Sequence, residues 1–296
     1  MRTPPPREDR LGLGVVIALI VFLFFTLIDT SAKWLALAGY PPMLVVFSRY
    51  FFHAAMSLVW FLPTEGWGML RARRPDLQLW RTVFLAAGTI FNFFAVKYLP
   101  LSVTISIFFA SPMLISLLSI PILGERIGSR RFAAIVVGFC GVLVITQPWS
   151  VSFQPAMLLS LAAVTCASLF FVMTRKLAGE DTNATSQIWS AGIATVALIP
   201  VAVAVWETPQ TYLHWAIFII AGLFGFFGHA LMVVAYRYAE AVKLAPVVYS
   251  QIFYATALGW LVFGTVPTAS TAVGAAIIIA SGLYIWARER QLRQRG

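Results

Sequence analysis

The sequence predicts an all-α integral membrane protein with ten transmembrane helices, arranged as two inverted five-helix repeats. Three observations predict this fold class: an apolar composition, ten apolar runs of membrane-spanning length, and basic residues that alternate from one loop to the next. Of the 296 residues, 60% are hydrophobic and 11% are charged, whereas about a quarter of a soluble domain is charged. A water-soluble fold of this size could not bury so much apolar surface.

The ten spans follow from length and from the residues that interrupt the apolar runs. A spanning helix needs about 20 mainly apolar residues, and Pro, Gly and charge clusters divide the chain into ten such runs. The predicted spans are Leu11–Ala38, Met43–Leu62, Leu79–Tyr98, Leu101–Leu123, Phe132–Gln147, Pro155–Lys176, Ala184–Val205, Tyr212–Tyr238, Lys243–Gly264 and Ser270–Ala287.

The basic residues predict the orientation of these spans. The connections around Pro41-Pro42, 148–154, 206–214 and 265–269 contain no Lys or Arg, and the connections between them are basic. Ten spans place 18 of the 21 basic residues on one side, and the positive-inside rule then puts both termini in the cytoplasm. These 18 are Arg2, Arg7, Arg10, Arg71, Arg73, Arg74, Arg81, Arg126, Arg130, Arg131, Arg175, Lys176, Arg237, Lys243, Arg288, Arg290, Arg293 and Arg295.

The net charge of +10 therefore indicates contact with a lipid bilayer, and we expect no nucleic acid partner. Cys140 and Cys166 lie in apolar runs without a nearby His or acidic cluster, so neither a metal site nor a cofactor is expected. The expected organisation is a cytoplasmic tail over 1–10, a first repeat over 11–147, a second repeat over 155–287, and a cytoplasmic tail over 288–296. Such a chain can work as a monomer.

A weak internal repeat supports the division into halves. A shift of 140 residues places Ala95-Val-Lys-Tyr98 on Ala235-Tyr-Arg-Tyr238 and Gly124 on Gly264. Five spans per half is an odd number, so the second copy enters the membrane from the opposite side. An inverted repeat of this kind places a substrate site near the midplane, between the halves.

One segment resembles a known family. Leu123-Gly-Glu-Arg-Ile-Gly-Ser-Arg-Arg-Phe132, followed by Gly138-Phe-Cys-Gly141, is similar to the junction of the fourth and fifth spans in EamA-type members of the drug/metabolite transporter superfamily. The equivalent junction of the second half, Phe263–Pro267, lacks the acidic residue, which argues against a transport role for Glu125. The layout also resembles YddG-type exporters of aromatic and other amino acids. This resemblance implies a bacterial inner-membrane exporter of small metabolites that is not an enzyme.

Charges inside a span are costly, so each one is a candidate functional group. Asp29 and Lys33 lie four residues apart in the first span, a spacing that predicts an internal ion pair. Arg49 and His53 repeat this spacing in the second span. The functional interpretation is that Arg49 or Lys33 attracts a substrate carboxylate while Asp29 holds an amino group or a proton; the structural alternative is that the charges pin two helices together.

Other polar and aromatic groups near the midplane complete the predicted lining. His53 and His229 could titrate near neutral pH, and His229 follows a run of glycines, Gly222, Gly225 and Gly228, that permits close helix approach. Under the shift of 140 residues Ser111 corresponds to Gln251, and we expect these two to face each other. The remaining candidates are Phe91, Asn92, Trp189, Tyr249 and Tyr254.

These observations predict a secondary transporter that exports amino acids, including aromatic ones, or related small metabolites by alternating access. Two alternatives stay open at this point. One is efflux of hydrophobic cations, which prefer a buried carboxylate beside aromatic rings. The other is a membrane enzyme or scaffold that shares the fold without transporting anything; Asp29 as the only carboxylate within the spans offers no hydrolytic constellation.

Overall fold

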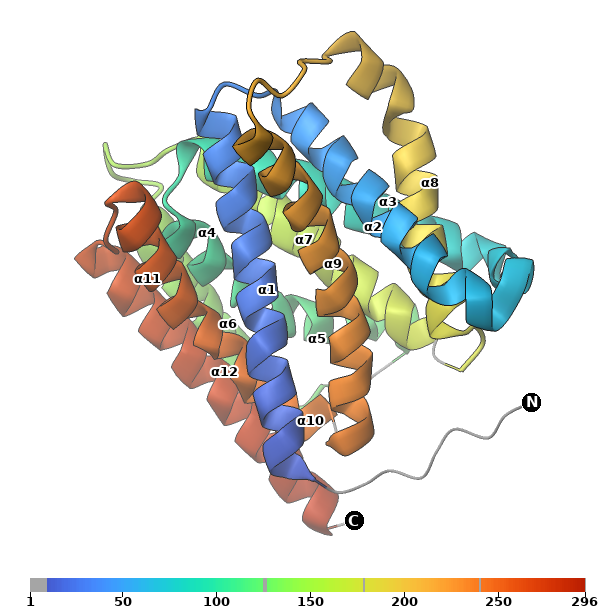
Figure 1. Cartoon of the computed structure of the whole chain (residues 1–296). Coiled ribbons are helices and arrows are strands. Elements are labelled where there is room, and N and C mark those ends of the chain that lie inside the picture. Colours follow the sequence, from blue (N-terminus) through green and yellow to red (C-terminus); the bar gives the residue numbers. More distant parts are fainter. Residues whose placement is uncertain (1–9, 125–126, 178, 240, 296) are drawn as a thin grey trace.

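The computed structural model describes residues 10–124, 127–177, 179–239 and 241–295, and it confirms the predicted fold class (Figure 1). Within these ranges no strand occurs, and ten helical segments are long and apolar enough to cross a membrane. Glu125 and Arg126 of the Gly-Glu-Arg motif, and residues 1–9 of the expected amino-terminal tail, lie outside the described residues.

The helices follow the predicted spans closely. The first half contains α1 (Leu11–Leu37), α2 (Pro42–Glu65) with the 3₁₀ turn η1 (Gly66–Leu70), α3 (Pro75–Tyr98), α4 (Leu101–Phe108), α5 (Ser111–Leu123) and α6 (Ser129–Thr146). The second half contains α7 (Ala156–Lys176), α8 (Asn183–Ala204), α9 (Tyr212–Tyr238), α10 (Ala241–Leu244), η2 (Ala245–Ser250), α11 (Gln251–Phe263) and α12 (Ala269–Arg295).

Several helix ends differ from the prediction, and two of the differences matter here. Helix α3 begins at Pro75 instead of Leu79, because proline suits the first helical turn, where no N–H is needed. Arg81, which was counted with the basic loop residues, therefore lies well inside the helix. Helix α12 continues to Arg295, through most of the expected tail over 288–296. The start of α1 and the end of α12 lie at the same end of the bundle (Figure 1), which we call the basic end.

The fourth and ninth spans are both broken, and the breaks are related by the internal repeat. Helices α5 and α11 each contain 13 residues and begin 140 positions apart, at Ser111 and Gln251. Each ends at a glycine with left-handed backbone geometry, Gly124 at φ 71° and Gly264 at φ 65°, a conformation that residues with a Cβ rarely adopt. Pro112 has no N–H to donate to the carbonyl of Phe108, which accounts for the first break.

Helix packing follows the two-fold relation of an inverted repeat. Helix α1 packs along α9, and α3 packs along α7. In the repeat α7 is the counterpart of α1 and α9 is the counterpart of α3, so the two-fold relation converts one pair into the other. Figure 1 shows α1 and α9 side by side. The two breaks also meet, because the rings of Phe109 and Tyr249, 140 positions apart, lie edge to face with centroids 5.2 Å apart.

The two related breaks are packed differently. Residues Leu101 to Ile107 of α4 are all buried, and α4 contacts α7, α11 and α12. A shift of 140 residues places α4 on α10 and the first four residues of η2. Among the described side chains there Leu244 is buried, and the others, Lys243 and 245–248, are exposed or half-buried. Helix α4 lies in the half of the bundle away from the basic end, so that half is packed more completely around the breaks.

Helix α9 packs tightly on α2 and α1 through its glycines. A Cβ on Gly222 would collide with the Cβ of Phe52 and would lie 3.0 Å from the backbone oxygen of Arg49. A Cβ on Gly228 would lie 2.7 Å from the ring of Phe25 in α1. Small residues are what allow helix backbones to approach this closely in a membrane.

We predict that Gly222→Ala lowers the free energy of unfolding by about 1–3 kcal/mol, because the added methyl group has no room between α9 and α2. The matched control is Gly192→Ala in α8, where the nearest atom outside the helix backbone is 3.8 Å away, in ordinary contact. The control should be neutral or stabilising by up to about 1 kcal/mol. Thermal unfolding of the purified protein measures both variants, and equal midpoints would contradict the packing described here.

Candidate functional site

Six polar side chains from five helices meet inside the bundle, and we call this group the central polar cluster. Its members are Asp29, Arg49, His53, Asn92, Gln187 and His229, from α1, α2, α3, α8 and α9. Arg49, His53, Asn92 and Gln187 are each at least 92% buried. The cluster therefore combines residues of both repeats, as the sequence predicts for a site between them, and it adds Gln187.

Arg49 is held on one side by α3. Its Nη1 donates to Thr89 Oγ1 at 2.9 Å, and Thr89 Oγ1 also lies 2.7 Å from the hydroxyl of Tyr50. The guanidinium lies 4.9 Å from the centroid of the Tyr50 ring. Its Nε has no hydrogen-bond partner among the described residues. A planar cation held in this way has that N–H available for a carboxylate or carbonyl oxygen.

His53 is held by a hydrogen bond from its Nε2 to Gln187 Oε1, at 2.8 Å. An amide oxygen only accepts, so with Gln187 Oε1 in this position His53 Nε2 is the donor, and in the neutral tautomer that makes this bond Nδ1 is left as an acceptor. The ring of His53 stacks on that of His229, with centroids 5.8 Å apart and 24° between planes. The ring of His229 also lies against the rings of Phe25 of α1 and Phe170 of α7, with centroid distances of 5.3 and 6.3 Å.

The expected ion pair between Asp29 and Lys33 is not formed. Asn92 Nδ2 donates to Asp29 Oδ1 at 2.8 Å, while Lys33 Nζ donates to the backbone oxygens of Val96 and Leu99, at 3.0 and 2.6 Å. The last carbonyls of a helix have no partner within it and carry partial negative charge, so the end of α3 competes successfully with Asp29 for the lysine.

Four buried polar atoms of the cluster have no hydrogen-bond partner within the described chain: Arg49 Nε, His53 Nδ1, Asn92 Oδ1 and Gln187 Nε2. Each belongs to a side chain that is held by another of its atoms. Two of the four are donors and two are acceptors. Leaving such a group unpaired in a protein interior costs about 1–3 kcal/mol. A polar ligand that pairs with these four atoms would therefore gain binding free energy there.

The structure places the other predicted residues elsewhere. Ser111 lies 3.2 Å from Ser168 of α7, and no hydrogen bond joins it to Gln251 in the described chain. Tyr249 packs on Phe109 at the helix breaks and against Gly282. Trp189 donates its Nε1 to the carbonyl of Leu70, near the basic end. Tyr254 packs in an apolar cluster with Ala18 and Phe22, and Phe91 is half-buried beside Asn92.

A second polar network, which the sequence analysis missed, lies toward the basic end. Arg81 is 91% buried, and its guanidinium donates four hydrogen bonds, to Thr174 Oγ1, Gln78 Oε1, Ser190 Oγ and the carbonyl of Ser186. Gln78 in turn donates to Asp181 Oδ2 at 2.9 Å. The network joins α3 to α7 and α8. Its sequence signal was the position of Arg81 within the predicted span Leu79–Tyr98.

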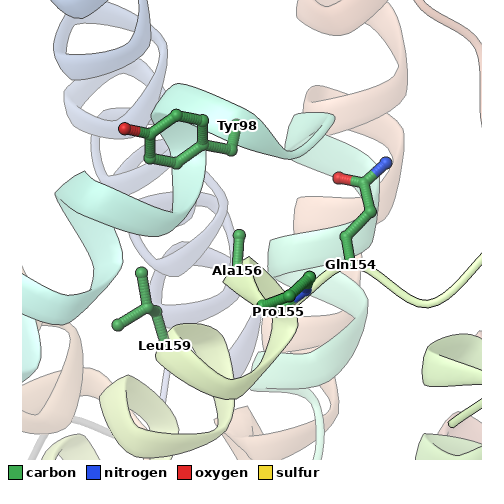
Figure 2. Close-up of a pocket in the computed structure, with 5 residues that line it drawn as sticks. All are labelled: Tyr98, Gln154, Pro155, Ala156 and Leu159. Atoms are coloured by element: carbon green, nitrogen blue, oxygen red, sulfur yellow. The ribbon is translucent and has the colours of Figure 1, made fainter.

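An open pocket of about 540 Å³ lies where α3 ends and α7 begins (Figure 2). It is lined by Tyr98, Gln154, Pro155, Ala156 and Leu159, and its walls are almost entirely apolar. It contains none of the central polar cluster. Within the described residues no group of three His, Cys, Asp or Glu side chains could hold a metal ion.

Comparison with known proteins gives matches along nearly the whole chain. The profile of the EamA-like transporter family matches residues 12–147 and again 154–287. A protein of Rhizobium johnstonii named "Riboflavin transporter" is 28% identical over 97% of this chain and 95% of its own. A protein of Rickettsia prowazekii named "S-adenosylmethionine uptake transporter" is 26% identical over 83% of each chain. One solved crystal structure covers 96% of this chain and 99% of its own with a TM-score of 0.63 at 18% identity, which shows a shared fold.

Lys33→Met should lower the free energy of unfolding by about 1.5–3 kcal/mol, because the variant removes a charged donor from two helix-end carbonyls. Lys97→Met is the matched control, since Lys97 lies in the last turn of α3, the helix whose end Lys33 binds, and is half-buried. Thermal unfolding in detergent compares the two. A larger loss from Lys97→Met would contradict the role given to Lys33.

Arg81→Gln should lower the free energy of unfolding by about 1–3 kcal/mol, because it strands several buried acceptors of α7 and α8. Arg237→Gln, an exposed position near the end of α9, serves as the control and should change stability by less than about 0.5 kcal/mol. Chemical denaturation followed by tryptophan fluorescence measures both, and equal losses would show that the network around Arg81 adds no stability.

Proposed function

Because the chain belongs to the EamA-like transporter family, whose profile matches both of its halves, we propose that it is a secondary transporter that carries one small, ring-bearing polar metabolite through the central polar cluster. The family places it in the drug/metabolite transporter superfamily, as a membrane protein that transports small molecules and is not an enzyme. The single observation that carries the substrate proposal is the set of four unpaired polar atoms beside the stacked rings of His53 and His229.

A planar nitrogen heterocycle is the first substrate candidate. Riboflavin and S-adenosylmethionine, which appear in the names of two relatives, both carry such a ring, with hydroxyl groups attached. The rings of His53, His229, Phe25 and Phe170 offer faces and edges for aromatic contact. The unpaired donors and acceptors match the polar edge of a heterocycle, which presents both kinds of group.

Export of amino acids, aromatic ones included, is the second candidate, and the opposite charges of Asp29 and Arg49 favour it. A carboxylate on Arg49 and an ammonium on Asp29 would satisfy a zwitterion. The guanidinium of Arg49 in the same cluster disfavours efflux of hydrophobic cations, because like charges repel each other. Lys33, which the sequence suggests as the compensating charge, is instead bound to the end of α3.

We further propose that the basic end faces the cytoplasm of a bacterial cell and that the protein lies in the inner membrane. The positive-inside rule supports this orientation. Under it the tails 1–10 and 288–296 are cytoplasmic, and the repeats 11–147 and 155–287 move against each other to expose the cluster alternately to each side. The substrate and the bilayer are then the partners of a chain that can act as a monomer, without a cofactor.

Counterflow in proteoliposomes tests this function without assuming a direction of transport. We expect exchange of labelled riboflavin or another member of a panel with S-adenosylmethionine, phenylalanine and tryptophan. Arg49→Gln should lower the rate by about ten-fold or more, the effect of losing about 1.4 kcal/mol of binding. Arg237→Gln, a loss of the same charge on the exposed end of α9, should leave the rate unchanged. Absence of exchange for the whole panel would reject the proposal.

A further inference from the structure

Helix α9 lies directly on two of the unpaired polar atoms of α2. A Cβ on Gly225 would be 3.3 Å from His53 Nδ1 and 3.8 Å from Arg49 Nε. One turn earlier, a Cβ on Gly222 would be 3.0 Å from the backbone oxygen of Arg49 and 3.1 Å from the backbone nitrogen of His53. The surface next to these two atoms is therefore the glycine face of α9, while His229 and Phe226 of the same helix contact the ring of His53.

Packing of this kind leaves both atoms unpaired. Arg49 and His53 are 94% and 98% buried, and Arg49 Nε and His53 Nδ1 have no partner within the described residues. The other side of each group is bonded, Arg49 Nη1 to Thr89 and His53 Nε2 to Gln187. Each side chain is thus held by α3 or α8 through one of its atoms, and its unpaired atom lies beside Gly225 of α9. Buried polar groups without partners are rare in native proteins and call for a functional explanation.

The chemistry of the two atoms limits what could satisfy them. Arg49 Nε is a donor, and in the tautomer whose Nε2 donates to Gln187, His53 Nδ1 is an acceptor. A ligand that satisfies both must present an acceptor and a donor close together. The N–H and C=O of a heterocyclic imide do so, and so do the charged groups of an amino acid. A hydrophobic cation without an acceptor does not.

We propose that His53 Nδ1 and Arg49 Nε are the atoms that hydrogen-bond the substrate, and that the glycine face of α9, Gly222 and Gly225, covers them in this structure and separates from α2 to admit it. The inference rests on the proposed function and adds the recognition atoms and the helix that controls access. A glycine face suits this task, because it seals the site by close backbone contact, and the ring of His229, which stacks on His53, moves away with the same helix.

Two substitutions of His53 separate recognition from structural support. The amide of Gln reaches the position of Nε2 and can keep the bond to Gln187, whereas the shorter amide of Asn reaches the position of Nδ1 and can keep the acceptor. We expect His53→Gln to weaken the apparent affinity for transported riboflavin by about ten-fold, the value of one hydrogen bond. His53→Asn should stay within about three-fold of the unchanged protein, although it is less stable.

The reverse order of affinities would show that His53 acts only through Gln187, and would overturn the proposal. Both variants are compared as monodisperse protein, and the same counterflow assay is run with phenylalanine if riboflavin is not exchanged. No exchange of any panel compound by the unchanged protein would reject the transport function itself. Exchange that is equal in both variants would leave that function standing and reject this inference.

Accessibility of position 53 tests the covering helix without any substrate. In a Cys140→Ser, Cys166→Ser background, His53→Cys should react with a water-soluble methanethiosulfonate reagent in proteoliposomes, despite its 2% exposure in the covered state. Val46→Cys is the matched control, because Val46 lies on the same helix and is fully buried in the apolar core. Modification at position 53 and not at 46 supports separation of α9 from α2, and equal protection of both positions would refute it.

Discussion

The close contact between α2 and α9 is the interaction on which the rest of the structure depends. It brings a helix of the first repeat against a helix of the second, and it is possible because Gly222 and Gly225 lack side chains. The same contact encloses Arg49 and His53 where water cannot reach them. In hydrocarbon, a charged or polar group must find its partners within the bundle, so the helices around this contact supply Thr89, Gln187 and Asn92.

The cationic side chains within the bundle show how this requirement is met in different ways. Lys33 is satisfied by helix-end carbonyls, and Arg81 by a network of hydroxyl, amide and backbone oxygens across three helices. Both are structural solutions in which the donors of the cation are largely used. Arg49 differs, because one of its donors remains unpaired. That difference separates a cation that stabilises the bundle from one that is available to a ligand.

The inverted repeat explains why the cluster lies between the halves. The departures from symmetry provide the structural difference between the two sides of the bundle that alternating access needs. Helices α5 and α11 match in length and in their glycine ends, yet α4 is buried and η2 is largely not. Two halves with the same fold and different packing are what alternating access requires, since exchanging the two packings would expose the opposite side. The glycine face of α9 is then one of the contacts that such an exchange would break.

Much of the fold followed from the sequence, because span length, breaks and charge asymmetry are properties of local composition. The ten spans, the shift of 140 residues and the pairing of Gly124 with Gly264 were all visible in the chain. So was the occurrence of Arg49, His53, Asn92 and His229 as rare polar groups in apolar runs. The partners of these groups were not visible. Spacing along one helix suggested that Asp29 pairs with Lys33. A neighbour four residues away competes for hydrogen bonds with carbonyls, amides and hydroxyls on other helices. Only the positions of these groups in space decide which hydrogen bonds form.

For the same reason the tertiary structure alone revealed Gln187, the network of Arg81 and the covering of His53 by Gly225. A glutamine near a helix end or a glycine in an apolar run carries no local signal of what it touches. Sequence determines which residues are costly to bury in a bilayer. The packing of helices distant in the chain decides which of them are satisfied and which are left for a ligand, because a hydrogen bond depends on distances that no one-dimensional pattern records.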